Sequence, residues 1–182
     1  MKYIFYSVIG RHANETIKEI LKRKTEEIEA SGFSLWSAKI DKKSMEQAWG
    51  LSESDEVFVL CKISTNATDP FDGKKVIVAE RMLDKDGEKL IPYGIQTTYG
   101  EGKNYQAYVV ESYQFLPDNM DFDFGSYECV SSENKTIPFA ERFKHTYFQN
   151  TFGKINPSIK KKCNKPINVI MKLKYPFVVN IL

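Results

Sequence analysis

The chain opens with two stretches whose apolar residues follow different periods. Residues 2–9 form a β-branched and aromatic run that stops at Gly10, a pattern that predicts a buried strand. In residues 15–31 apolar side chains recur every three to four positions while Glu and Lys fill the rest, which predicts an amphipathic helix. Asn14 is placed to cap the N-terminus of this helix, and Gly32 stands where a C-terminal glycine belongs.

The pattern from residue 33 to residue 116 is mostly that of strands. The dipeptide Asp86-Gly87 favours a hairpin turn within it. In chain order the pattern predicts a strand at 33–40, a short helix at 44–51, and strands at 56–64, 74–83 and 104–116.

A late helix is predicted after Pro138, which suits the first turn of a helix. Three aromatic residues follow at i, i+4 and i+8, and Gly153 would end the helix. Residues 154–166 are interpreted as a basic linker before a last strand.

Together these elements predict an α+β fold: a small mixed, mostly antiparallel β-barrel or a strongly curved sheet. One long N-terminal helix, one short helix and one late C-terminal helix accompany it. We expect residues 1–137 to form the core domain and residues 138–182 a basic helical and extended appendage, packed on or beside it.

Charge is distributed unevenly along the 182 residues. Residues 142–182 contain nine Lys or Arg and no Asp or Glu, so they carry +9; subtracting this from the net charge of +2 leaves −7 for residues 1–141. This asymmetry indicates an anionic partner, either nucleic acid, a membrane surface or an acidic protein, or else a solvated lysine face. The expected nucleic-acid contacts are Arg142, Lys144, Lys160, Lys161 and Lys162.

Cysteine usage and hydropathy indicate the compartment. The chain has three widely spaced cysteines (Cys61, Cys129 and Cys163) and no C-x-x-C pair, which fits a reducing cytosol better than a disulfide framework or a zinc site. No run of eighteen apolar residues occurs, and Met1-Lys2 leads straight into the first strand rather than into a secretory leader. We therefore expect a cytoplasmic protein without membrane contact, and the oligomeric state stays open.

The segment Tyr99–Val110, YGEGKNYQAYVV, has some features of a phosphate-binding loop. A Walker A loop requires its first glycine at position 97, which is Thr97, and Asn104 occupies the Ser/Thr position. The following residues have a strand pattern, whereas phosphate loops lead into a helix. We interpret the segment as a connection between strands that lines a ligand cleft through Tyr99, Lys103 and Tyr105.

No metal or cofactor is expected. Asp118, Asp121 and Asp123 resemble a calcium loop in composition, but the D-x-[DN]-x-[DN]-G spacing and the closing Glu are absent.

The first strand-to-helix turn offers the best local cluster for a ligand. Free N–H groups and the helix dipole favour an anion there, Arg11 adds a planar fork, and His12 titrates near neutrality. We place Arg11, His12 and Asn14 in the ligand site, together with Trp36, which lies between two small residues and could stack on a base. The alternatives are a surface arginine, a loop histidine and a core tryptophan.

The order of elements, with the segment WGLSESDEVFVLC at 49–61, resembles the PUA-like barrels, notably the EVE and ASCH groups. The resemblance covers residues 2–116, and Asp55 stands where those proteins often carry an acid near a turn. It implies a small curved β-barrel with a cleft beside the first helix that binds RNA or a modified base. The chain departs from it in having Ser54-Asp55 in place of the usual G-D turn, and in its basic tail.

Three functions are compatible with these features. The leading hypothesis is a non-enzymatic binding module for nucleic acid or a nucleotide-like anionic ligand. The second is a small enzyme that acts on a nucleotide or another anionic metabolite, with Arg11 holding the anion and His12 as acid or base. The third is a protein–protein adaptor with an aromatic-rich interface.

Overall fold

The fold combines three helices and fourteen strands in the part of the chain that is described. A computed structural model describes residues 1–10, 15–64, 75–78, 81–84, 87–90, 96–99, 105–116, 120–131, 133–144 and 148–181. Its elements are β1 (Tyr3–Ile9), α1 (Ile17–Ser31), β2 (Ser34–Ala38), α2 (Lys42–Trp49), β3 (Val57–Ile63), β4 (Lys75–Val78), β5 (Arg81–Asp84), β6 (Gly87–Leu90), β7 (Gln96–Tyr99), β8 (Tyr105–Phe115), β9 (Asp121–Asp123), β10 (Tyr127–Val130), β11 (Thr136–Pro138), α3 (Phe139–Arg142), β12 (Thr151–Ile155), β13 (Asn164–Pro166) and β14 (Val169–Ile181). No helix among these residues is long and apolar enough to span a lipid bilayer.

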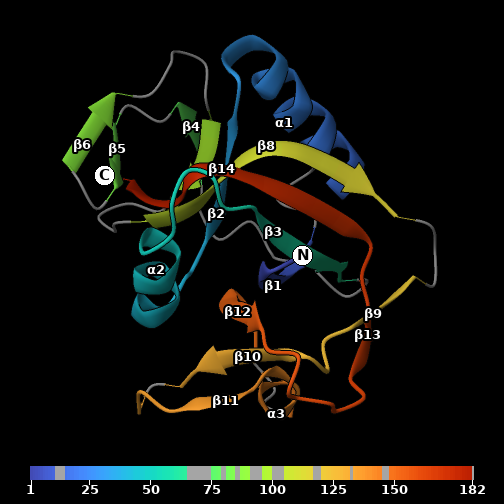
Figure 1. The fold of residues 1–182 in the computed structure, drawn as a ribbon. Coiled ribbons are helices and arrows are strands. Elements are labelled where there is room, and N and C mark those ends of the chain that lie inside the picture. The colour runs from blue at the N-terminus through green and yellow to red at the C-terminus, as the bar shows by residue number, and fades with distance from the viewer. Residues whose placement is uncertain are drawn as a thin grey trace.

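One mixed sheet of ten strands organises the molecule (Figure 1). Its strand order is β11-β10-β12-β1-β3-β14-β5-β6, and β8 pairs with β14 and β2 with β8. β1 and β3 run parallel, and the other neighbouring pairs in this sheet are antiparallel. Two further sheets have two strands each, β13-β9 and β4-β7. The α+β class and the mostly antiparallel sheet are confirmed, but the main sheet does not close into a barrel.

β14 is the strand on which the sheet depends most. Residues 169–172 pair with β3, and the same residues pair with β8, so β3 and β8 occupy opposite edges of β14. β5 pairs with residues 180 and 181 on the edge away from β8. The segment 138–182, expected as an appendage, thus supplies a strand inside the main sheet.

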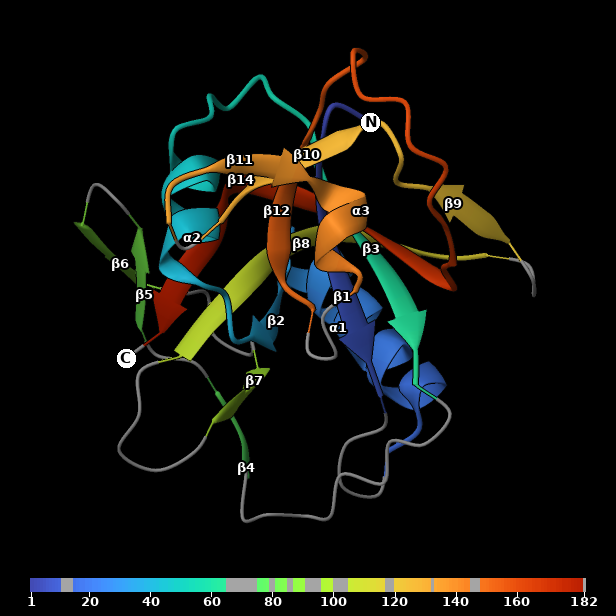
Figure 2. The same ribbon diagram turned by 90° about the horizontal axis from the view of Figure 1, so that it is seen from below.

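The sheet separates two apolar clusters because successive side chains of a strand point to opposite faces. Tyr3, Phe5 and Ile9 of β1 pack in a cluster with α1 and α2, and Ile4 and Tyr6 pack in a second cluster with the aromatic residues of α3. We call these the α1 side and the α3 side. Figure 1 shows α1 on one side of β1, β3 and β14, and α3 with the β10–β11 end of the sheet on the other; Figure 2, seen from below, shows α3, β10 and β11 in front.

The long helix forms as its pattern predicts, but its N-cap differs. Thr16, not Asn14, caps α1: its side chain accepts a hydrogen bond from Glu19 N, and the Glu19 carboxylate accepts one from Thr16 N. This capping box satisfies donors that the first turn leaves without partners. Gly32 ends the helix with φ 82°, as predicted.

The predicted helix from Pro138 to Gly153 is wrong in its C-terminal part, because residues 148–150 are not helical and residues 151–153 belong to a strand, while residues 145–147 lie outside the described part of the chain. α3 ends at Arg142, and residues 151–155 form β12, which is antiparallel to β1. Asn150 takes a left-handed conformation with φ 54° directly before β12, which no helix interior accommodates. Gly153 then allows close packing, because a Cβ there would lie 2.8 Å from the Phe139 ring.

Candidate functional site: a basic patch beside α3

Most of the predicted ligand cluster falls outside the residues that the structure describes. Arg11, His12, Asn14 and Lys103 lie there entirely. Tyr99 ends β7 and Tyr105 begins β8, and only their backbone is described.

Trp36 lies partly buried on β2, on the α1 side of the sheet. Its ring centre is 6.1 Å from that of Tyr113, whose hydroxyl is 2.7 Å from Ser34 Oγ. β2 is paired with β8 and lies beside β7. The structure therefore places β2, which carries Trp36, beside the strands that carry Tyr99 and Tyr105, and the cleft itself stays a prediction.

A charged cluster on α1 lies near Tyr113, the residue that contacts Trp36, and was not predicted. Lys24 and Glu27 are buried, with Lys24 Nζ 3.2 Å from Glu27 Oε2, and Arg23 contacts Glu15 at 2.8 Å. Burial lowers the pKa of Lys24 to about 8 against the opposing effect of Glu27. The sequence could have indicated the burial of Lys24, because Lys24 is three residues after Leu21 and so falls on the buried stripe of the helix.

A buried polar cluster lies between β1, β8 and the residue before β12. Ser7 Oγ donates a 2.8 Å hydrogen bond to Asn150 Oδ1, and the Tyr108 hydroxyl donates one of 3.1 Å to the same oxygen. An amide oxygen is not a general base, and burial raises the pKa of Tyr108 well above its usual value. The cluster therefore holds Asn150 in place and does not activate the serine.

The basic residues of the C-terminal segment form a patch on the α3 side. Glu141 Oε2 is 2.7 Å from Lys144 Nζ, and Glu141 Oε1 is 2.6 Å from Lys161 Nζ. These two hydrogen bonds lower the pKa of Glu141 to about 2. Lys160 and Lys162 are exposed on either side of Lys161. We call Arg142, Lys144, Lys160, Lys161, Lys162 and Lys165 the basic patch.

The segment 160–162 is held against the β9–β10 turn by its backbone. Lys161 N donates a 3.2 Å hydrogen bond to Gly125 O, and Cys163 N donates one to Asp123 Oδ1. A Cβ at Gly125 would overlap the Lys161 carbonyl, so the approach requires glycine. This backbone contact positions Lys161, whose hydrogen bond to Glu141, 20 residues away in sequence, joins the segment to α3.

Two cations of the basic patch rest on aromatic rings. The Arg142 guanidinium lies 5.6 Å from the centre of the Phe148 ring, and Lys165 Nζ lies 5.3 Å from that of Phe143. The two rings contact each other edge to face at 4.8 Å. Within the described residues, Arg142 Nε is buried and has no hydrogen-bond partner.

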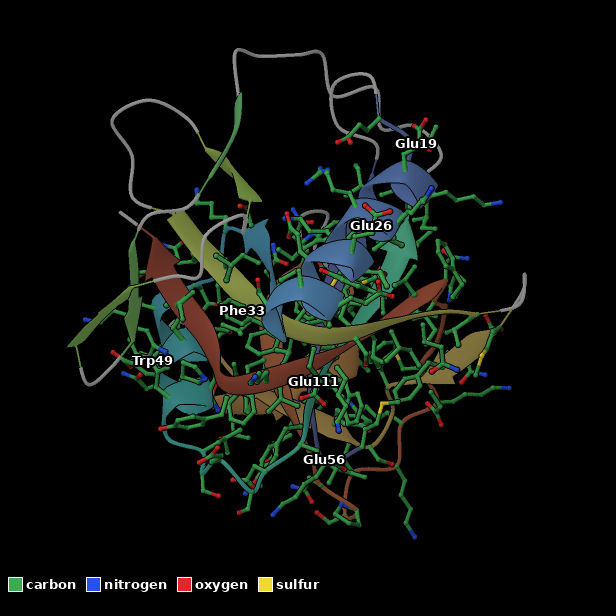
Figure 3. All side chains as sticks on the ribbon, turned by 90° about the horizontal axis from the view of Figure 1, so that it is seen from above. Glu19, Glu26, Phe33, Trp49, Glu56 and Glu111 are labelled. Atoms are coloured by element: carbon green, nitrogen blue, oxygen red, sulfur yellow. The ribbon has the colours of Figure 1, made fainter. Side chains whose placement is uncertain are left out.

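Other cations of the segment do not join the patch. Lys172 Nζ is 2.8 Å from Glu111 and 3.5 Å from Glu56, two acids labelled in Figure 3. Lys174 Nζ lies 3.5 Å from Gly32 O, at the end of α1. Acids from residues 1–141 thus neutralise Lys172, and six of the nine cations of residues 142–182 belong to the basic patch.

Trp36, the one residue of the predicted pocket whose side chain is described, and the aromatic residues under the basic patch lie on opposite sides of the sheet. Trp36 packs against the cluster on the α1 side. Phe143, whose ring lies beneath Lys165 Nζ, packs against the cluster on the α3 side. One compact ligand does not contact both. Five residues of the basic patch are the predicted nucleic-acid contacts, and Lys165, which was not predicted, is added by its place over Phe143.

The chain matches no family model, no curated protein and no solved structure. In the described part of the chain, no group of three or more His, Cys, Asp or Glu side chains is arranged to hold a metal ion. All three cysteines are free and buried, and burial raises their pKa values, to about 11 for Cys129.

Proposed function

We propose that the protein is a non-enzymatic module that binds nucleic acid through the basic patch. The observation that carries this proposal is the double contact of Glu141 with Lys144 and Lys161, which joins two basic segments into one surface. Lysine and arginine clusters neutralise phosphates and release counterions, and this is the main source of sequence-independent affinity for nucleic acids.

The charge balance of the patch favours a polyanion over a single small anion. Lys144 and Lys161 share one carboxylate, so Glu141 cancels only one of their two charges. Lys160 and Lys162 are exposed and add two more. A ligand with several phosphates can contact these cations together, which a metabolite with one carboxylate cannot.

Fluorescence anisotropy over a salt series tests the proposal, with labelled single- and double-stranded RNA and DNA as ligands. We expect the logarithm of the binding constant to fall linearly with the logarithm of salt concentration, with a slope of about −0.9 per phosphate contact on duplex DNA or about −0.7 on single strands. Lys160→Ala with Lys162→Ala should reduce the magnitude of this slope by about one per lysine.

The matched control is Lys18→Ala with Lys22→Ala. Both lysines are exposed on α1, on the opposite side of the sheet, and their loss changes the net charge equally. The control should bind like the wild-type protein. Equal loss in both double variants, or no binding by the wild-type protein, would refute the proposal.

A further inference from the structure

Arg142 differs from the other arginine whose contacts the structure describes. Arg23 Nε and one terminal nitrogen donate to the two carboxylate oxygens of Glu15 at 3.1 and 2.8 Å. Arg142 has no such acceptor among the described residues, and its Nε is shielded from water as well. A buried donor without a partner lowers stability, so this arginine is held in place at a cost to folding.

Aromatic packing fixes the position of the Arg142 guanidinium. It stacks over Phe148, which is itself buried and lies 4.9 Å from Phe139, 4.8 Å from Phe143 and 6.0 Å from Tyr6, measured between ring centres. A guanidinium that rests on a packed ring loses little further freedom when it binds a ligand.

A second cation, Lys165, rests on Phe143, the ring that contacts Phe148 edge to face. In the β13–β9 pair Lys165 stands opposite Phe122, which packs into the cluster on the α3 side, and Lys165 Nζ rests over Phe143. Both carboxylate oxygens of the neighbouring Glu141 already accept hydrogen bonds, one from Lys144 and one from Lys161. Among the described residues no carboxylate forms an ion pair with Arg142 or with Lys165.

We infer that Arg142 and Lys165 form a phosphate subsite within the basic patch. The two terminal nitrogens of a guanidinium form a planar pair of donors for two phosphate oxygens, so the subsite does not require the buried Nε, and an ammonium on the adjacent ring contributes a second charge. The inference rests on the proposed function, because it assigns to this subsite one phosphate of the bound nucleic acid. The exposed lysines then supply contacts that depend on charge alone.

Inorganic pyrophosphate is the probe that tests the subsite without nucleic acid. Amide chemical shifts of the wild-type protein are recorded during a titration at constant ionic strength. We expect saturable shifts at the amides of α3 and β13. Arg142→Gln should weaken binding by about tenfold or more, since a hydrogen bond to a charged group contributes about 1.5–3 kcal/mol. Arg142→Lys should bind with intermediate affinity, because it keeps the charge and loses the planar fork.

Lys18→Gln serves as the control that removes one exposed charge from α1, and it should leave the titration unchanged. The subsite is refuted by an absence of saturable shifts in the wild-type protein, by shifts confined to the α1 side, or by equal affinity in Arg142→Gln. The wild-type titration needs no variant to fold, so each outcome decides the question.

The two proposals fail in different ways. Nucleic-acid binding that depends on Lys160 and Lys162 but is unaffected by Arg142→Gln would refute the subsite and keep the proposed function. Saturable pyrophosphate binding at Arg142, without nucleic-acid binding, would refute the proposed function and keep the subsite. It would indicate a small phosphorylated ligand.

Discussion

At the scale of single residues, Gly153 shows how closely the α3 side is packed. It lies in β12 between Phe139 of α3 and Ile4 of β1, and a Cβ there would come within 2.8 Å of one side chain and 3.3 Å of the other. Neither neighbour can yield easily, because both are fully buried.

Gly153→Ala should therefore lower the free energy of unfolding by about 1–3 kcal/mol, as overpacking of a core does. Urea denaturation followed by circular dichroism measures it. Gly50→Ala is the control: Gly50 has φ −75°, which alanine adopts readily, and its Cβ would lie 3.3 Å from Gln47 O rather than 2.8 Å from a buried ring, so the loss should be smaller than for Gly153→Ala. Equal effects of the two substitutions would contradict the packing argument.

Lys24 predicts a pH dependence of stability with a definite sign. Its pKa is lowered from 10.5 to about 8 in the folded protein, mainly by burial, while Glu27, Glu15 and Arg23 act on the same group. Between these two values the unfolded chain binds more protons, so the free energy of unfolding should rise with pH.

Lys24→Met removes this contribution, and the gain in stability between about pH 7 and about pH 9.5 should be smaller than in the wild-type protein. Urea denaturation at the two pH values measures the difference. Lys18→Met, an exposed change on the same helix, should keep the wild-type dependence. An unchanged pH dependence in Lys24→Met would show that Lys24 does not titrate in this range.

At the scale of elements, the N-terminus of α1 depends on the side chain of Thr16. Thr16→Ala removes the hydrogen bond to Glu19 N, and should lower the free energy of unfolding by about 1 kcal/mol. Thr16→Ser keeps the hydroxyl and should lose much less. If both substitutions destabilise equally, the capping hydrogen bond does not contribute and the loss has another cause.

Local patterns predict elements well where one period dominates, as in β1 and α1. They mislead at residues 139–153, where aromatic residues at helical spacing predicted a continuous helix. Phe139 and Phe143 do pack together, but α3 ends at Arg142 and Asn150 takes a left-handed conformation directly before β12. The decisive interaction, the pairing of β12 with β1, joins residues about 150 positions apart, and no local window contains it.

At the scale of the whole molecule, the sequence could predict which residues belong to the candidate site. It could not predict where the fold places them. The sequence identifies the basic residues, since their excess after Glu141 is plain. It does not show that Lys172 is neutralised by Glu111 and Glu56, or that Trp36 and Arg142 lie on opposite sides of a sheet. The order of the strands decides which ion pairs form and on which side of the sheet each side chain lies. That order depends on the position of β14.

The position of β14 also predicts that residues 1–137 do not fold alone. Without β14, an edge of β3 and an edge of β8 lose their partners, and Val169, Met171 and Leu173 leave the core. A chain of residues 1–137 should show poorly dispersed amide resonances, whereas residues 1–182 should show a dispersed spectrum. A dispersed spectrum for the shorter chain would mean that residues 138–182 are an independent appendage.

The same feature has a consequence for synthesis in the cell. The ribosome makes β3 and β8 long before residues 169–181 emerge, so the two strands spend that interval with unpaired edges. Such edges and the apolar faces beside them are the surfaces on which nascent chains aggregate. We therefore expect the growing chain to depend on chaperones until its final strand enters the sheet.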